Sequence, residues 1–153
     1  MKQKYNNSFI RSAGVVFAIS GSAKVLSAHG TAKILTVADP ILGLQFGHLM
    51  LLVGALELIG AAACLSGRLL HQTTVMVAWF ATNVFAYRLG LWWIGWHRPC
   101  SCLGNVTDAV HISPQAADMA MRVILAYLLI GSYATLFWLW RQRNAALPTS
   151  VQN

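Results

Sequence analysis

The sequence predicts an all-α fold, an integral membrane four-helix bundle that forms a single domain over residues 1–153. The first observation is composition: 57% of the residues are hydrophobic, 10% are charged and the mean hydropathy is +0.57. Such a chain is too apolar for a soluble domain of this size. The second is that its apolar residues fall into four stretches of about 20 residues or more, the length that spans a bilayer. We expect spans at about 9–26, 40–66, 72–96 and 114–140.

The first span begins after Lys2 and Lys4 and has Lys24 near its end. A basic start before an apolar run also resembles a signal peptide. However, Lys24 lies where a cleavage site requires small residues, so we expect a retained helix.

Short polar signals predict where the later helices begin and end. Asp39-Pro40 provides a capping acid and a proline at the first helical position, and we expect the second span to start there. Gly67 should end that helix. Ser113-Pro114 repeats the starting signal for the fourth span.

The basic residues predict the orientation. One side of the predicted bundle carries Lys2, Lys4, Arg11, Arg68, Arg141 and Arg143. The other side has Lys33 and Arg98 in its loops and Lys24, Arg88 and Arg122 within or at the ends of its spans, so the bias is modest. By the positive-inside rule, both termini are cytoplasmic in a multi-pass protein of the bacterial inner (cytoplasmic) membrane. The net charge of +7 is scattered over segment ends rather than gathered on one face, so we expect membrane lipid around the chain and no nucleic-acid partner.

The predicted external loop, 97–113, carries the strongest chemical signal, Cys100-Ser101-Cys102. Two thiols one residue apart can react with each other, and closing so short a loop gives a strained disulfide that gains little chain entropy. Strained disulfides are exchange-active, and the preceding His97 and Arg98 would favour a thiolate. We therefore take Cys100 and Cys102 as the candidate catalytic residues. An inert structural disulfide is the alternative.

Four polar residues inside the spans are candidate supporting residues. Glu57 lies about nine residues, or roughly 14 Å, from the cytoplasmic end of its helix, near the bilayer midplane. A carboxyl group there is functional by default, paired with a cation or protonated; a structural bond to Asn83 or a serine is the alternative. His48 and Arg88 lie about 12 Å below the outer face, and with Lys24 they could line a polar pocket under the loop. Alternatively, Lys24 and Arg88 snorkel to the interface and His48 only packs between helices.

Besides its four spans, the chain has three motifs that bear on its family: Gly21-Ser22-Ala23-Lys24 at the end of the first span, Glu57 in the second, and Pro99-Cys100-Ser101-Cys102-Leu103-Gly104 after the third. In these features the chain resembles the MauE/DoxX group of redox-associated membrane proteins. The resemblance covers about residues 9 to 140. Cys100, Cys102 and Gly104 match the Cys-x-Cys-Phe-Gly loop of the MauE branch, with Leu103 in place of the aromatic residue. The resemblance implies a helper protein in methylamine utilisation, which takes part in maturation of the disulfide-rich small subunit of methylamine dehydrogenase, or a related periplasmic redox role.

The expected function is thus a thiol–disulfide redox helper whose partner is a periplasmic thioredoxin-like protein or a disulfide-containing client. A membrane quinone is the candidate cofactor, and no resident metal is expected. Copper handling is the first alternative, with His97, His111 or Met119 joining the two cysteines as ligands. A small-solute carrier or assembly scaffold that depends on Glu57 is the second.

Overall fold

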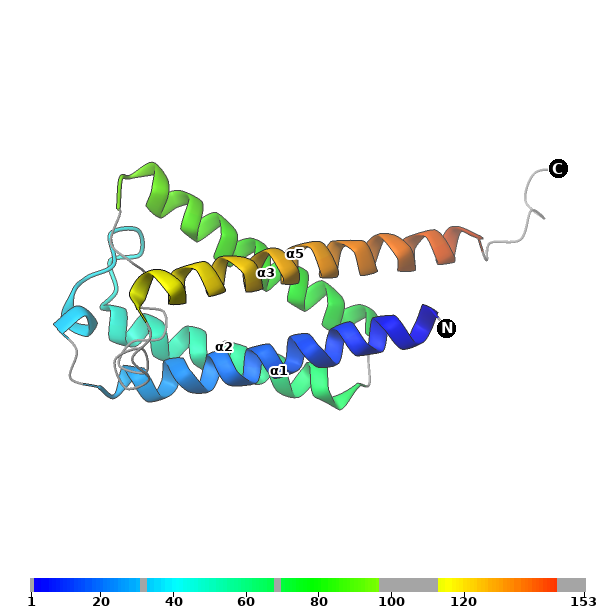
Figure 1. The fold of residues 1–153 in the computed structure, drawn as a ribbon, viewed down its shortest axis with the longest axis horizontal. Coiled ribbons are helices and arrows are strands. Elements are labelled where there is room, and N and C mark those ends of the chain that lie inside the picture. The colour runs from blue at the N-terminus through cyan, green and yellow to red at the C-terminus, as the bar shows by residue number, and fades with distance from the viewer. Residues whose placement is uncertain (1, 31–32, 68–69, 97–112, 146–153) are drawn as a thin grey trace.

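The computed structural model describes residues 2–30, 33–67, 70–96 and 113–145. Within these ranges the chain forms four α-helices and one short 3-10 helix: α1 (Lys2–Ala28), η1 (Lys33–Thr36), α2 (Phe46–Ser66), α3 (Leu70–Trp93) and α5 (Pro114–Ala145). Figure 1 shows the start of α1, the end of α2, the start of α3 and the end of α5 at one end of the molecule, which we call the terminal end. The opposite, loop end carries η1, the end of α3 and the start of α5. The predicted all-α fold is confirmed.

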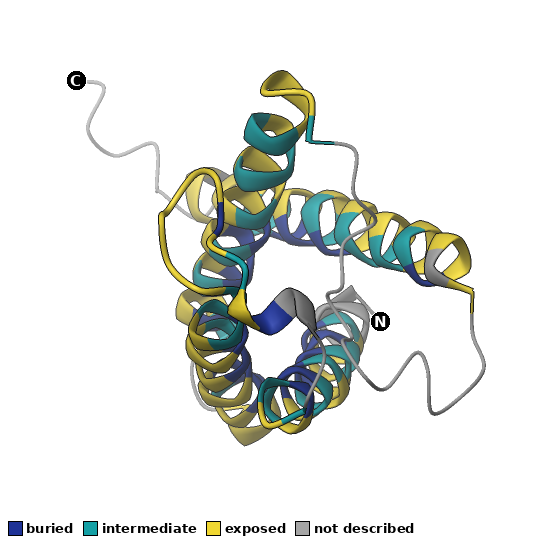
Figure 2. Ribbon diagram, turned by 90° about the vertical axis from the view of Figure 1, so that its left-hand side faces the viewer, coloured by how far each residue is buried: buried dark blue, intermediate teal, exposed yellow. Residues whose placement is uncertain are grey.

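Three of these helices are long and apolar enough to cross a membrane, over Asn7–Ala28, Phe46–Ser66 and Gln115–Asn144. Large apolar side chains on the outside of the bundle, such as Ile19, Ile59 and Ile130, are more than half exposed. Figure 2 shows that the exposed residues cover the outer faces of the helices. Such a surface is stable in lipid and unfavourable in water, so the structure supports a membrane protein.

Helix α3 is long enough to span, since its 24 residues extend about 36 Å. It does not reach the apolar level of the other three helices. Polar residues at its start, such as Gln72 and Thr73, and Asn83 and Arg88 further along account for the difference.

The helices associate mainly as two pairs, α1 with α2 and α3 with α5. In the first pair the backbones touch: a Cβ added to Gly21 would lie 2.9 Å from the Gly54 carbonyl oxygen, and one on Gly54 would lie 3.0 Å from that of Gly21. Small residues permit this close approach between membrane helices. A core that includes Phe17, Val77 and Leu128 joins the two pairs.

Helix α2 begins at Phe46, so the predicted start at Asp39-Pro40 is wrong. Asp39 does cap backbone N–H groups, because its Oδ1 accepts hydrogen bonds from Ile41 at 2.9 Å and Leu42 at 2.7 Å. These groups belong to a tight turn that ends at Gly43, whose φ is +68°. The same capping chemistry starts helices and turns, and here the turn forms.

The other terminal signals act as predicted. Gly67 ends α2 in the left-handed conformation with φ +65°. The Ser113 hydroxyl accepts a hydrogen bond from the Ala116 N–H at 3.3 Å, and α5 begins at Pro114. The boundaries differ elsewhere: α1 begins at Lys2, α3 extends over Leu70–Trp93 rather than 72–96, and α5 continues to Ala145 rather than 140.

Candidate functional site

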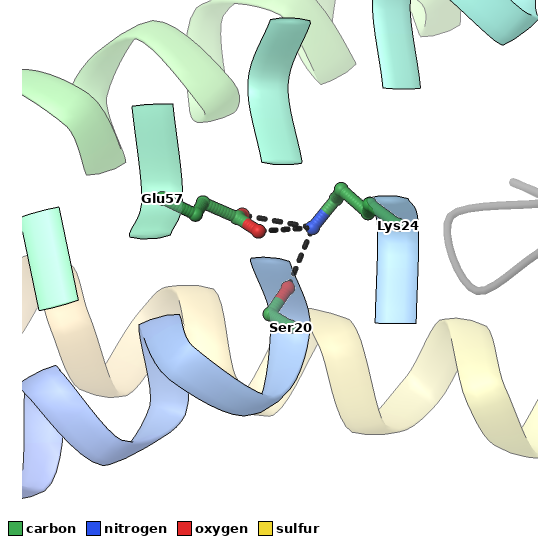
Figure 3. A network of polar contacts seen from close by, with 3 residues as sticks. All are labelled: Ser20, Lys24 and Glu57. Carbon is green, nitrogen blue, oxygen red and sulfur yellow. Dashed lines mark hydrogen bonds and ion pairs between the residues drawn. The ribbon is translucent and has the colours of Figure 1, made fainter. Parts of the chain in front are cut away.

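A buried ion pair joins the first two helices. Lys24 Nζ on α1 donates hydrogen bonds to both carboxylate oxygens of Glu57 on α2, each at 2.8 Å, and a third to Ser20 Oγ at 2.5 Å. Figure 3 shows the ammonium group between the hydroxyl and the carboxylate. All three N–H donors of the lysine therefore have an acceptor.

The directions of the two helices explain why these side chains meet. Side chains on a helix lean towards its N-terminus. In α1 this carries Lys24 away from the loop end, back over Ser20 one turn earlier. Because α2 is antiparallel to α1, the same lean carries Glu57 towards the loop end and towards Lys24. The contact of Gly21 with Gly54 holds the two helices close enough for the pair to form.

The pair is almost completely removed from solvent, with Lys24 6% exposed and Glu57 5% exposed. Removing two charges from water costs several kcal/mol per ion before their attraction compensates. Within a bilayer, ionisable residues are costly and occur mostly where they serve a function. We therefore take Ser20, Lys24 and Glu57 as the centre of the candidate site.

These three residues line a cavity of about 450 Å³ between the two helix pairs. All four helices contribute to its wall, for example through Phe17, Phe46, Phe80 and Leu128. The rest of the lining is mostly apolar, and the few other polar side chains in it are Asn83, Tyr87 and Arg88.

Tyr87 and Arg88 connect α3 to its neighbours near the loop end. The Tyr87 hydroxyl donates a short hydrogen bond to Asp39 Oδ2, which ties the turn before α2 to α3. Arg88 pairs with Asp118 of α5 at 2.7 Å, and Arg122 contacts the other oxygen of the same carboxylate. The polar contacts at this end thus join the loop before α2 and both members of the second helix pair.

The structure brings together three of the four intramembrane residues that the sequence singled out. Lys24, Glu57 and Arg88 all line the cavity, whereas His48 is exposed and does not. Lys24 does not snorkel to the interface as the alternative assumed, since it is buried against Glu57. Asn83 is not the partner of Glu57, because its amide nitrogen donates to the Trp79 carbonyl oxygen within α3.

The predicted redox residues Cys100 and Cys102, together with His97 and Arg98, lie outside the described residues, as does His111 of the copper alternative. Met119, the remaining candidate ligand, is 69% exposed on α5. Over the part of the chain that the structure describes, no three His, Cys, Asp or Glu side chains are grouped closely enough to hold a metal ion.

Sequence reasoning missed the Lys24–Glu57 pair, the Asp39–Tyr87 bond and the role of Asp118. One signal could have found them. The chain has only four acidic residues against eleven Lys and Arg, so each acid within the bundle should have a nearby donor. The three acids in the described residues do, each with a partner on another element.

No protein-family model matches the chain, and no curated protein or solved structure matches it.

Proposed function

We propose that this chain is a thiol–disulfide redox helper of the MauE/DoxX kind, embedded in the bacterial inner membrane through four spans with both termini cytoplasmic. Cys100 and Cys102 are its reactive pair. A periplasmic thioredoxin-like protein or a disulfide-containing client is its partner. In the family to which the resemblance points, this role serves methylamine utilisation.

One observation carries the proposal: α3 ends and α5 begins at the loop end of the bundle, and both cysteines lie between these two helices in the sequence. The two helices border that end with Trp93 and Pro114, opposite the N-terminus and the end of α5. If the termini are cytoplasmic, the loop end faces the periplasm, which is an oxidising compartment where a cysteine pair can cycle.

The exchange reaction balances within the pair and its partner. One Cys thiolate attacks a sulfur of the partner disulfide and forms a mixed disulfide, and the other Cys then displaces the partner. The products are a Cys100–Cys102 disulfide and a reduced partner dithiol, so two electrons and two protons leave the chain. The reverse steps reduce the pair again.

The apolar lining of the cavity disfavours the alternative function of a carrier for hydrophilic solutes. The wall is mostly apolar, and the buried charges at Lys24 and Glu57 already neutralise each other. A hydrophilic solute would lose its hydration there without enough polar partners in return.

Thiol trapping across a series of glutathione buffers tests the redox proposal. We expect Cys100 and Cys102 to form a reversible disulfide with a potential above about −250 mV, in the range of exchange-active bonds. The Cys100→Ser/Cys102→Ser variant, which keeps Cys64, is the matched control for trapping at other sites. A pair that stays oxidised below about −300 mV would be structural. A pair that never oxidises and copurifies with stoichiometric metal would favour copper handling.

Labelling in spheroplasts tests the orientation. After mild reduction, a membrane-impermeant thiol reagent should modify Cys100 or Cys102 in intact spheroplasts. Cys64 is fully buried in the core and serves as an internal control that reacts only after denaturation. Labelling of the pair only after lysis would reverse the proposed orientation.

A further inference from the structure

The cavity has the size and lining of a binding site for a lipid-soluble molecule. Its volume of about 450 Å³ lies within the range of ligand pockets, roughly 300–1,000 Å³. Such pockets have mostly apolar walls with a few polar groups that orient the ligand. Here the polar groups of the wall include the hydrogen-bonded set Ser20, Lys24 and Glu57, which we call the polar base.

The cavity is open towards lipid. Its lining includes Leu52 and Leu56 of α2 and Trp79 of α3, and these side chains are 54%, 46% and 63% exposed. The three residues lie well inside their helices, so this exposed rim is at bilayer depth in a membrane-embedded bundle. Because α2 and α3 make few contacts with each other, an apolar molecule can enter between them from the bilayer.

The polar base has acceptor positions and one donor hydrogen left for a ligand. Lys24 has used all three N–H donors. A carboxylate offers about four acceptor positions, and Lys24 occupies two of those on Glu57. The Ser20 oxygen accepts from Lys24, which leaves the hydroxyl hydrogen to donate. A ligand group that both donates and accepts a hydrogen bond therefore complements the base.

We propose that the cavity binds a neutral, lipid-soluble molecule through a hydroxyl group that donates to Glu57 and accepts from Ser20. A ligand ammonium group would have to be desolvated and would compete with Lys24 for the carboxylate. A ligand carboxylate would meet Glu57 with like charge. A ketone or ether has no hydrogen for Glu57. The class with this chemistry comprises membrane alcohols and reduced quinones, and the site does not depend on the cysteine pair.

Saturation binding to the purified full-length protein in nanodiscs tests the proposal. The probes are a decyl hydroquinone, 1-decanol and decanoate, which carry unbranched alkyl chains of nine or ten carbons and differ in the polar group. We expect saturable binding of the hydroquinone, the alcohol or both, and at least tenfold weaker binding of decanoate. The two hydroxyl probes distinguish the sources: preference for the hydroquinone indicates a reduced quinone, and equal binding indicates a membrane alcohol.

Two variants test the place of the ligand. Lys24→Met/Glu57→Leu removes both charges with side chains of similar size and should weaken hydroxyl binding by about tenfold to a hundredfold, as expected for loss of a hydrogen bond to a charged group. Val84→Trp should block the cavity, which Val84 lines. Val123→Trp is the matched control, because Val123 is 66% exposed on α5 and does not line the cavity.

The possible outcomes separate the proposal from nonspecific filling by acyl chains. Equal binding of all three probes, unchanged in Lys24→Met/Glu57→Leu, would overturn it. Tighter binding of decanoate would also overturn it and would point to Arg88 as the anchor of an anionic lipid. Absence of saturable binding to a protein that is folded by circular dichroism would overturn it as well.

Discussion

Replacing Glu57 with leucine should destabilise the protein more than any other single change in the site. Lys24 Nζ would lose its counter-charge and two hydrogen bonds of 2.8 Å and would keep only the bond to Ser20. The lysine side chain is 8% exposed and cannot recover these bonds from water. Removing one partner of a buried pair costs about 3–5 kcal/mol, a large share of a typical stability of about 5–15 kcal/mol.

Two further variants separate the ion pair from other effects of the substitution. Glu57→Gln keeps the shape and one acceptor oxygen, so its loss of stability should be smaller than that of Glu57→Leu. Lys24→Met/Glu57→Leu removes both charges and replaces them with apolar groups. Because such replacements of buried pairs are often neutral, we expect it to unfold within about 1 kcal/mol of the wild type.

Equilibrium unfolding in mixed detergent micelles, followed by circular dichroism, measures all three variants against the wild type. The order of stability should be wild type and double variant, then Glu57→Gln, then Glu57→Leu. If Glu57→Leu were as stable as the wild type, the buried pair would contribute nothing. If the double variant were no more stable than Glu57→Leu, the loss would come from packing around residue 57 and not from an unpaired lysine.

Two other contacts give predictions. Gly21→Ala should cost about 1–3 kcal/mol of unfolding free energy, because the added Cβ would lie 2.9 Å from a backbone oxygen of α2. The control is Ser22→Ala at the neighbouring exposed position. Equal stability of the two variants would contradict the close approach of α1 and α2. Tyr87→Phe removes the donor to Asp39 and should speed hydrogen exchange in the turn before α2. Tyr127→Phe, which loses an exposed bond to Ser12, should leave that turn unchanged.

The sequence signals that correctly predicted helix ends depend on neighbouring residues only. Gly67 ends α2 because a glycine adopts a positive φ without strain, and Ser113-Pro114 starts α5 because the two residues satisfy and replace N–H groups of the first turn. The Asp39-Pro40 signal failed because the same carboxylate can cap a turn. This displaced the predicted start of α2 by about two turns. It also displaced the estimated depth of His48 below the outer face, which was counted from that start, by about 9 Å.

The pairing of side chains within the candidate site could not be predicted from the sequence in the same way. Lys24 and Glu57 are on different helices, and the sequence predicted Glu57 near the bilayer midplane but grouped Lys24 with a polar pocket under the loop. Side-chain lean and the contact of Gly21 with Gly54 bring the ammonium and carboxylate groups together. Arg88 was expected near a polar pocket, but its pairing with Asp118 depends on how α3 packs against α5.

The amino-acid sequence by itself therefore determined the class of the protein: an all-α bundle with an apolar, lipid-compatible surface, few charges inside it and a cysteine pair between the residues that form α3 and those that form α5. Composition and helix-end chemistry are properties of neighbouring residues, so they are visible in the chain. Only the tertiary structure decided that Glu57 pairs with Lys24, that His48 lies apart from them, and that the buried pair lines a lipid-facing cavity. These outcomes depend on the rotation and spacing of helices about one another, which are determined by packing between residues far apart in the sequence.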